Sequence, residues 1–107
     1  MIVELRRYLP VRDRERDLDH RFRTSTLDLF ARRGFKVTDF WVTEGATEIV
    51  YLVEWDSVEQ MTEAWEAFRT DPEWLAIKRA TEADGPITAS IISTVLHRPD
   101  YFQPARL

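Results

Sequence analysis

The sequence predicts an α+β fold of the ferredoxin-like, split β-α-β type, in which a four-stranded antiparallel sheet carries helices on one face. Two observations predict this fold. Four segments rich in β-branched and aromatic residues, at 2–8, 35–44, 48–55 and 87–97, are typical of strands. Amphipathic helical patterns fill the intervals 12–33 and 57–84, so the order of elements is β-α-β-β-α-α-β, and its second half repeats the first with a broken helix.

The long helix predicted over 12–33 has one apolar side. The residues on that side are Leu18, Phe22, Leu29 and Phe30. Arg32 and Arg33 are favoured at the negative end of the helix dipole, and Gly34 readily takes the left-handed conformation that ends a helix. The strands at 35–44 and 48–55 follow, and the short turn over 45–47 predicts that they pair antiparallel.

The second half begins with a helix-capping signal. Ser57 and Gln60 stand at the spacing of a capping box, and Asp71 with Pro72 marks the first turn of a further short helix. The last strand, at 87–97, is β-branched on both faces. This pattern predicts a central position in the sheet.

Both faces of the predicted sheet are too apolar for contact with water. One alternating set is Phe40, Val42, Val50, Leu52, Ile92 and Leu96, and the other is Val37, Trp41, Ile49, Tyr51, Val53, Trp55, Ile91 and Val95. Helices on one face leave the other uncovered, and a monomer would then expose an unusually large apolar patch. The sequence therefore predicts a homodimer that closes sheet on sheet.

Length and charge limit the class of protein. The 107 residues, 44% of them hydrophobic, suit one domain over residues 1–107 with a single core. The net charge of −4, with 15 basic residues scattered among 19 acidic ones, argues against a nucleic-acid partner. The sequence contains no cysteine, which excludes disulfides and thiolate metal sites. It shows no membrane-spanning run and no leader pattern, so we expect a cytoplasmic protein without a membrane partner.

The first strand carries polar residues on one face. Glu4, Arg6 and Tyr8 alternate with the apolar Val3 and Leu5. If this face lines a cavity, Arg6 could hold a carboxylate or an enolate, Glu4 could transfer a proton, and Tyr8 could donate to a developing oxyanion. The alternative is an ion pair between Glu4 and Arg6 beside the dimer seam, with Tyr8 in a packing role.

Large aromatic residues are the second candidate constellation. They are Trp41, Tyr51, Trp55, Trp65 and Trp74. Such a set can form a flat slot for a planar, conjugated ligand, and each buried indole N–H needs a partner. The alternative is that these side chains pack the core, with Tyr51 and Trp41 as the best candidates for ligand contact.

Three further residues are weaker candidates. His97 closes the last strand, where it could act as a general base or a haem ligand, or simply bond to a backbone carbonyl at the rim. His20 falls on the solvated side of the first helix. Asp39 lies between Val37 and Trp41 on one alternating face, so it is either a third polar group in the cavity or an acid that protects an edge strand.

We expect no metal and no cofactor. The two histidines are far apart, and the carboxylates show no recognisable ligand spacing. Three glycines cannot form a P-loop or a dinucleotide-binding motif, and the sequence has no serine-hydrolase elbow.

Several motifs together resemble the NIPSNAP family over nearly the whole chain. These motifs are IVELRxY at 2–8, GFKV at 34–37 followed by FW at 40–41, VYLVEWDS at 50–57, DPEW at 71–74 and LHRP at 96–99. The resemblance implies a dimeric α+β barrel fold and no settled activity. The wider superfamily includes cofactor-independent monooxygenases, polyketide cyclases, isomerases and haem-binding enzymes, which favours a small-molecule pocket by analogy.

These observations lead to one preferred function and two alternatives. The preferred hypothesis is a homodimer that binds a small aromatic or conjugated organic molecule and catalyses cofactor-independent cyclisation, isomerisation or oxygenation. A non-catalytic scaffold dimer that uses the aromatic tail Tyr101-Phe102 is the second hypothesis, and a haem-handling dimer that uses His97 is the third.

Overall fold

The computed structural model describes residues 1–105, and its elements follow the predicted order. They are β1 (Ile2–Pro10), α1 (Glu15–Arg21), the π-helical turn η1 (Phe22–Thr26), α2 (Leu27–Arg32), β2 (Lys36–Val42), β3 (Ile49–Trp55), α3 (Val58–Arg69), α4 (Pro72–Thr81) and β4 (Thr88–Leu96). The last two residues of the predicted domain, 106 and 107, lie outside the described residues. The predicted ferredoxin-like α+β class is confirmed.

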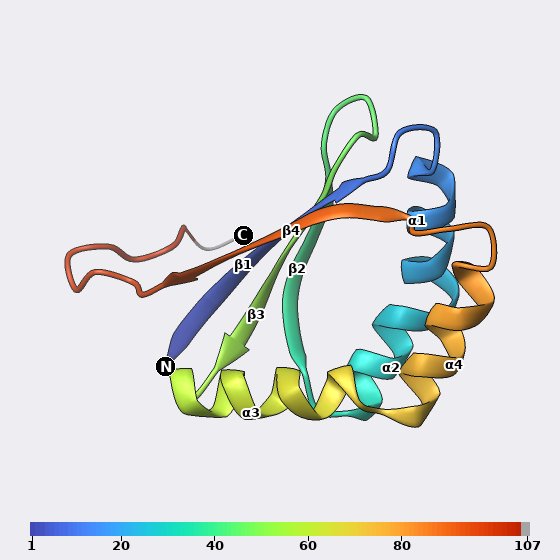
Figure 1. Ribbon diagram of the computed structural model, residues 1–107. Helices are drawn as coiled ribbons and strands as arrows, with labels where there is room; N and C mark the ends of the chain where they lie inside the picture. Colours follow the sequence, from blue (N-terminus) through green and yellow to red (C-terminus); the bar gives the residue numbers. More distant parts are fainter. Residues whose placement is uncertain (106–107) are drawn as a thin grey trace.

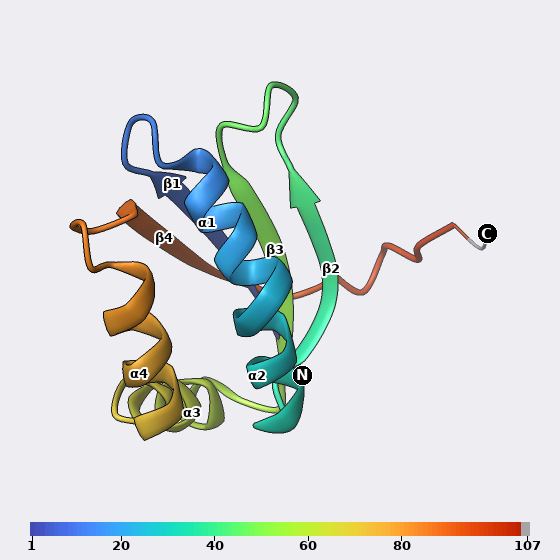
Figure 2. The same cartoon turned by 90° about the vertical axis from the view of Figure 1, so that its right-hand side faces the viewer.

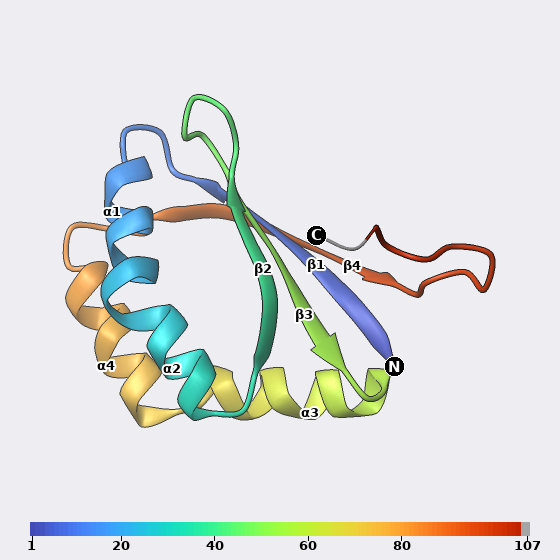
Figure 3. The ribbon, with the colours of Figure 1, turned by 180° about the vertical axis from the view of Figure 1, so that it is seen from behind.

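All four strands form one antiparallel sheet in the order β2-β3-β1-β4. The helices cover one face of this sheet. In Figure 1, α1, α2 and α4 lie to the right of the strands and α3 runs along the bottom; in Figure 3, α1, α2 and α4 lie to the left. Figure 2 looks at the helices with the sheet behind them and shows α1 and α2 in one column beside α4. Within residues 1–105 the opposite face of the sheet carries no helix, and we call it the open face.

The predicted central position of the last strand is wrong, because β4 is an edge strand that pairs only with β1 among the described strands. Its side chains from Ile91 to Leu96 are all exposed in the single chain. Apolar residues on both faces of a strand predict that both faces are buried, but the pattern is the same whether this chain or a second chain buries them.

A bulge in β2 changes which residues face the helices. Val37 pairs with Val53, but Asp39 already pairs with Leu52, so Thr38 is an extra residue in β2. Beyond this point the alternation is reversed. Trp41 therefore lies on the open face, and Phe40 faces the helices, where its ring stacks on Tyr51 with centroids 5.8 Å apart. The predicted single alternation through Val37, Asp39 and Trp41 is wrong for this reason.

The helix predicted over 12–33 forms over 15–32, with a wide turn in its middle. In η1 the Leu27 amide donates to the Phe22 carbonyl, five residues back, as in a π-helix. The Thr26 hydroxyl compensates by donating to the Arg21 carbonyl at 3.3 Å. Such turns are frequent at functional sites, and Arg21 immediately precedes this one.

Predicted caps begin both later helices. Ser57 Oγ accepts the Gln60 amide at 3.1 Å, and the Gln60 side chain accepts the Asp56 amide at 2.6 Å, one residue earlier than in a standard capping box. Asp71 accepts the amides of Glu73 and Trp74 at the start of α4. The core between the sheet and the helices is built mainly from aromatic rings, which are Tyr8, Phe22, Phe30, Phe35, Tyr51, Trp55, Trp65 and Phe68.

Candidate functional site

A cavity of about 600 Å³ lies between β1 and the start of β4 on one side and α1, α3 and α4 on the other. We call it the β1 cavity. The part of its lining that carries chemistry is Arg6, Tyr8, Arg21, Trp65, Trp74 and Glu82. Its volume falls in the range of small-molecule sites, and its lining combines indole faces with a few polar groups.

Glu4 lies directly behind the cavity wall, where its carboxylate is buried. Trp55 Nε1 and Trp65 Nε1 donate to Glu4 Oε1 at 3.0 and 2.7 Å. Ser93 Oγ and Arg6 Nη1 donate to Glu4 Oε2 at 2.5 and 3.4 Å. Four donors converge on two oxygens, which is the pattern that an ionised carboxylate accepts. Both oxygens of the Glu4 carboxylate are therefore occupied by hydrogen bonds from neighbouring residues, and Glu4 does not line the cavity.

Arg6 and Tyr8 form the polar part of the cavity wall nearest to Glu4. The Arg6 guanidinium lies 3.9 Å from the Trp65 ring centroid, a close cation–π contact. Arg6 Nη2 donates to Tyr8 Oη at 3.0 Å, and Tyr51 Oη donates to the same atom at 2.8 Å. Both lone pairs of the Tyr8 oxygen are thus occupied. The hydroxyl proton of Tyr8 is left to donate to something else.

Burial and hydrogen bonding fix the protonation states behind Tyr8. Burial raises the pKa of Tyr51 well above its ordinary value, and the Tyr8 oxygen raises it further. Burial alone would lower the pKa of Arg6, but the oxygens of Tyr8 and Tyr51 outweigh it and the net change is upward. Tyr51 therefore keeps its proton and Arg6 keeps its charge, so both act as hydrogen-bond donors toward Tyr8.

Arg21 forms a second polar cluster in the cavity wall. It is 4% exposed, and its Nη1 donates to Glu82 at 2.9 Å and to Thr81 at 3.2 Å. Its Nη2 donates to Thr88 at 3.4 Å, and its guanidinium lies 5.0 Å from the Trp74 ring centroid. A buried arginine with one carboxylate partner joins α1 to the end of α4.

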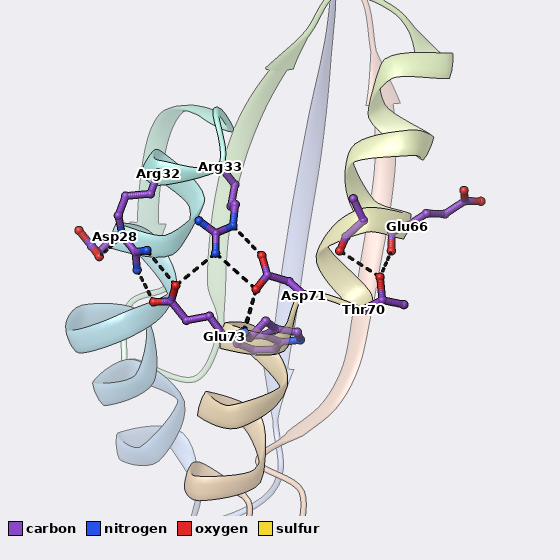
Figure 4. Close-up of polar contacts among 9 residues, drawn as sticks. Asp28, Arg32, Arg33, Glu66, Thr70, Asp71 and Glu73 are labelled. Carbon is purple, nitrogen blue, oxygen red and sulfur yellow. Dashed lines mark hydrogen bonds and ion pairs between the residues drawn. The ribbon is translucent and has the colours of Figure 1, made fainter.

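Ion pairs also hold the other end of α4 (Figure 4). Arg32 donates to Glu73, and Arg33 donates to both Asp71 and Glu73, so the end of α2 is joined to the start of α4. We call this set of four residues the α4 clamp. The hydrogen bond from Arg33 is the main reason that the pKa of Asp71 is lowered, and the hydrogen bond from Arg32 is the main reason for Glu73.

The structure brings together some of the residues predicted to form a site. Arg6, Tyr8, Trp65 and Trp74 line the β1 cavity. Glu4 and Tyr51 lie buried behind it and bond to residues of the lining. The ion pair between Glu4 and Arg6, named above as the alternative, is present at 3.4 Å; it lies on the helix side of the sheet, beside a cavity large enough for a ligand.

Asp39, Trp41 and His97 lie elsewhere. The bulge in β2 places Asp39 and Trp41 on the open face, and Asp39 borders a separate cavity beside α2. His97 is exposed beyond the end of β4, whereas the cavity contacts only the first residues of that strand, on the order of 20 Å away at 3.3 Å per residue. Asp39 does not line the β1 cavity, and it lies on the edge strand β2, the position that the other interpretation gave it.

Sequence reasoning missed Arg21 and Glu82. Arg21 interrupts the apolar side of the first helix between Leu18 and Phe22, and an arginine at such a position was a usable signal. Glu82 follows the last helix and had no signal of its own. Within residues 1–105 there is no group of three or more potential metal-binding side chains, and no helix there has the length and apolarity needed to cross a membrane.

The fold and the cavity define a ferredoxin-like α+β protein with a polar and aromatic cavity between its sheet and its helices. The chain belongs to the NIPSNAP family, because the NIPSNAP family model matches residues 3–98. The resemblance read from its motifs is confirmed. Among curated proteins, none matches this sequence.

Solved structures share the fold at low sequence identity. A NIPSNAP family protein from Agrobacterium tumefaciens str. C58 has a TM-score of 0.80 at 19% identity, covering 98% of both chains. A NIPSNAP-like domain protein from Burkholderia xenovorans has a TM-score of 0.79 at 17% identity, covering 98% of this chain and 90% of the other. A candidate antibiotic biosynthesis monooxygenase from Nitrosomonas europaea has a TM-score of 0.62 at 14% identity, covering 92% of this chain and 98% of the other. At these identities the comparison shows the fold alone.

Replacing Glu4 tests its role as the buried acceptor. Glu4→Gln keeps the size of the side chain but leaves at least one buried donor without an acceptor, so we expect the free energy of unfolding to fall by about 2–4 kcal/mol. Urea denaturation followed by far-UV circular dichroism measures this change. Glu54→Gln, on the open side of β3, is the control and should cost less than about 1 kcal/mol. Equal stability of the two variants would contradict the role of Glu4.

The α4 clamp predicts a specific acid sensitivity. Because the pKa values of Asp71 and Glu73 are lowered in the folded state, the clamp stabilises the fold fully above their ordinary values of roughly 4 and loses this contribution as pH falls through the lowered values. We expect Glu73→Gln to be less stable than the wild type near pH 7. The variant should also lose less stability between about pH 5 and pH 2.5, as measured by urea midpoints.

The control for the clamp is Glu63→Gln, which removes an exposed carboxylate of α3 that belongs to no ion pair described in residues 1–105. An identical loss of stability on acidification in Glu73→Gln and the wild type would show that the clamp does not contribute.

Proposed function

We propose that the β1 cavity binds a small aromatic or conjugated organic molecule and stabilises an enolate-like oxygen on it. The observation that carries this proposal is the hydrogen bonding of Tyr8. Its oxygen accepts bonds from Arg6 and Tyr51 and its own proton remains to be donated, so Tyr8 is polarised as a donor at the cavity wall. The Arg6 charge beside it favours negative charge on the bound oxygen.

The aromatic lining supports a planar ligand. Trp65 and Trp74 contribute indole rings to the cavity, and Phe68 lies between them, 5.8 Å from Trp65 and 5.0 Å from Trp74 by ring centroids. Flat rings of this kind pack favourably against conjugated ligands. The chemistry that follows is cofactor-independent reaction through an enolate, formed when a water molecule takes the proton from the carbon while Tyr8 and Arg6 hold the oxygen: isomerisation, cyclisation, or oxygenation by molecular oxygen.

Roles for the predicted residues follow from this site. Tyr8 is the oxyanion donor and Arg6 the electrostatic anchor, as anticipated from the first strand. Glu4 is a positioning residue for Trp65 and Arg6 rather than an acid or base, because its oxygens are already occupied by four donors. Tyr51 holds the Tyr8 oxygen as an acceptor, and Trp65 and Trp74 form the slot.

A homodimer closed over the open face is the second part of the proposal. The apolar side chains on this face include Trp41, Ile92 and Leu96, which are 62%, 43% and 40% exposed in the single chain. With Leu5 and Leu52 they extend across all four strands, since each lies opposite a residue of the same face in the neighbouring strand. A second copy would remove this patch from water.

2-Naphthol tests the site directly, since it presents a planar ring system and one acidic oxygen. We expect the wild type to bind it and Tyr8→Phe to bind it about tenfold more weakly, because one hydrogen bond is lost. Isothermal titration calorimetry measures both affinities. Tyr101→Phe, which changes an exposed tyrosine in the C-terminal tail, should bind as the wild type does.

Two further measurements sharpen this experiment. trans-Decahydro-2-naphthol has the same oxygen on a saturated skeleton and should bind more weakly than 2-naphthol. Deuterium exchange at the α-carbon of 2-tetralone, followed by NMR, separates catalysis from binding, and Tyr8→Phe should slow the catalysed exchange by about 10². Equal binding of 2-naphthol by the wild type and Tyr8→Phe, or no binding by either, would overturn the proposed site.

The dimer is tested with Leu52→Lys, which puts a charge near the middle of the open face. We expect the wild type to elute with twice the chain mass in size-exclusion chromatography with light scattering, and the variant to shift toward the mass of one chain. Thr62→Lys, on the exposed side of α3, is the control. A wild type with the mass of a single chain would contradict the dimer.

A further inference from the structure

The β1 cavity contains two arginines arranged in the same way. Arg6 lies over the Trp65 ring at 3.9 Å, and Arg21 lies over the Trp74 ring at 5.0 Å. Within residues 1–105, the buried side-chain polar atoms without a hydrogen-bond partner are the Nε atoms of these two arginines. Buried unpaired donors destabilise a fold, so two of them on the wall of one cavity call for a functional explanation.

The free side of Arg21 suits a carboxylate. Its Nη1 is occupied by Glu82 and Thr81, whereas its Nε is unpaired and its Nη2 makes one long bond of 3.4 Å to Thr88. The Nε and Nη2 groups form one edge of the guanidinium, and a carboxylate binds such an edge through two parallel hydrogen bonds. No carboxylate of this chain pairs with this edge, but its Nε is closed to water in the structure, so a ligand carboxylate reaches it only when the surrounding side chains shift.

Lys78 adds charge beside Arg21. It lies one helical turn after Trp74 and one turn before Glu82, the residue that ends α4, and all three line the cavity. With Arg6 and Arg69, four cationic side chains line the cavity against the single carboxylate of Glu82. In a chain with a net charge of −4, this local excess of positive charge attracts anions to the cavity.

We propose that the ligand is an aromatic carboxylate whose ring system also carries an acidic hydroxyl or enol group. The carboxylate binds at Arg21 and Lys78, and the hydroxyl or enol oxygen binds at Tyr8 and Arg6. The assignment of the second oxygen rests on the proposed function, and the carboxylate is the new element. When no ligand is bound, Glu82 neutralises the charge of Arg21. When a carboxylate is bound, the negative charge of Glu82 repels it, so Glu82 limits the affinity of the cavity for the carboxylate.

The test compares 6-hydroxy-2-naphthoate, whose hydroxyl and carboxylate lie on different rings, with 2-naphthol by isothermal titration calorimetry at low ionic strength. These two probes differ by one carboxylate, so the ratio of their dissociation constants isolates its contribution. We expect the wild type to bind the carboxylate at least about tenfold more tightly. Added salt should reduce this ratio, because it screens charge.

Variants locate the carboxylate. Arg21→Lys keeps the charge but lacks the guanidinium edge and should reduce the ratio about tenfold, and Lys78→Gln should reduce it about threefold. Glu82→Gln should increase the ratio, a gain that misfolding cannot produce. Arg79→Gln removes the neighbouring exposed cation of α4 outside the cavity lining and should leave the ratio unchanged. Affinity for 2-naphthol is measured in every variant, so that the ratio reports the carboxylate alone; in Arg79→Gln this affinity should stay near the wild-type value.

Each adverse result identifies what has failed. If the wild type binds 2-naphthol but gains nothing from the carboxylate, the carboxylate site is overturned and the proposed function stands. If the gain persists in Arg21→Lys and Lys78→Gln but is lost in Arg6→Lys, the carboxylate binds at Arg6 and the assignment to Arg21 is wrong. If the wild type binds neither probe, the proposed function itself fails.

Discussion

The buried carboxylate of Glu4 is the interaction on which the rest of the site depends. It lies on β1 and accepts hydrogen bonds from β3, α3 and β4, through Trp55, Trp65 and Ser93. Each indole N–H would otherwise be buried without an acceptor, at a cost of roughly 1–3 kcal/mol. Because Glu4 fixes the Trp65 ring, that ring can stack on Arg6, and Arg6 in turn can donate to Tyr8. The carboxylate organises the cavity without entering it.

The two charged residues of the helix-facing side of β1, Glu4 and Arg6, therefore have different roles. The anion is enclosed by donors on every oxygen and serves the fold, whereas the cation keeps one buried N–H without a partner and borders the cavity. Two tryptophans determine which of the two charges is enclosed and which borders the cavity. The indole N–H groups of Trp55 and Trp65 both donate to Glu4, and the face of the Trp65 ring is left to contact Arg6.

Much of the fold could be predicted from the sequence, since its signals are local. Ser57 and Asp71 cap the helices that their spacing indicates, and Glu4, Arg6 and Tyr8 share one face of β1 as predicted; the structure puts that face on the helix side. The bulge could not be predicted, because Thr38 is an ordinary strand residue and nothing in its type marks an extra position. The error for Asp39 and Trp41 follows from that one residue.

The candidate site was predictable only in part, because half of it comes from side chains whose local context is unremarkable. Tyr8 and Arg6 stand out as polar residues in an apolar strand. Arg21 interrupts the apolar side of a helix, but its partner Glu82 becomes visible only when α1 and the end of α4 meet, 61 residues apart in the chain. Patterns along the sequence report which face is buried, but not which distant partner satisfies a buried charge.

The wall formed by α4 has a different physical character from the rest of the cavity. No side chain of α4 is fully buried, although Trp74 and Ile77 pack partly against the core, and both ends of the helix are held by ion pairs to α1 and α2. Local opening of a helix costs least where buried apolar contacts are few. Dissolved ions screen the pairs that hold α4 and leave the aromatic core untouched. Entry to the cavity and survival of the fold therefore respond to different solution conditions, the first to ionic strength and the second to whatever weakens hydrophobic packing.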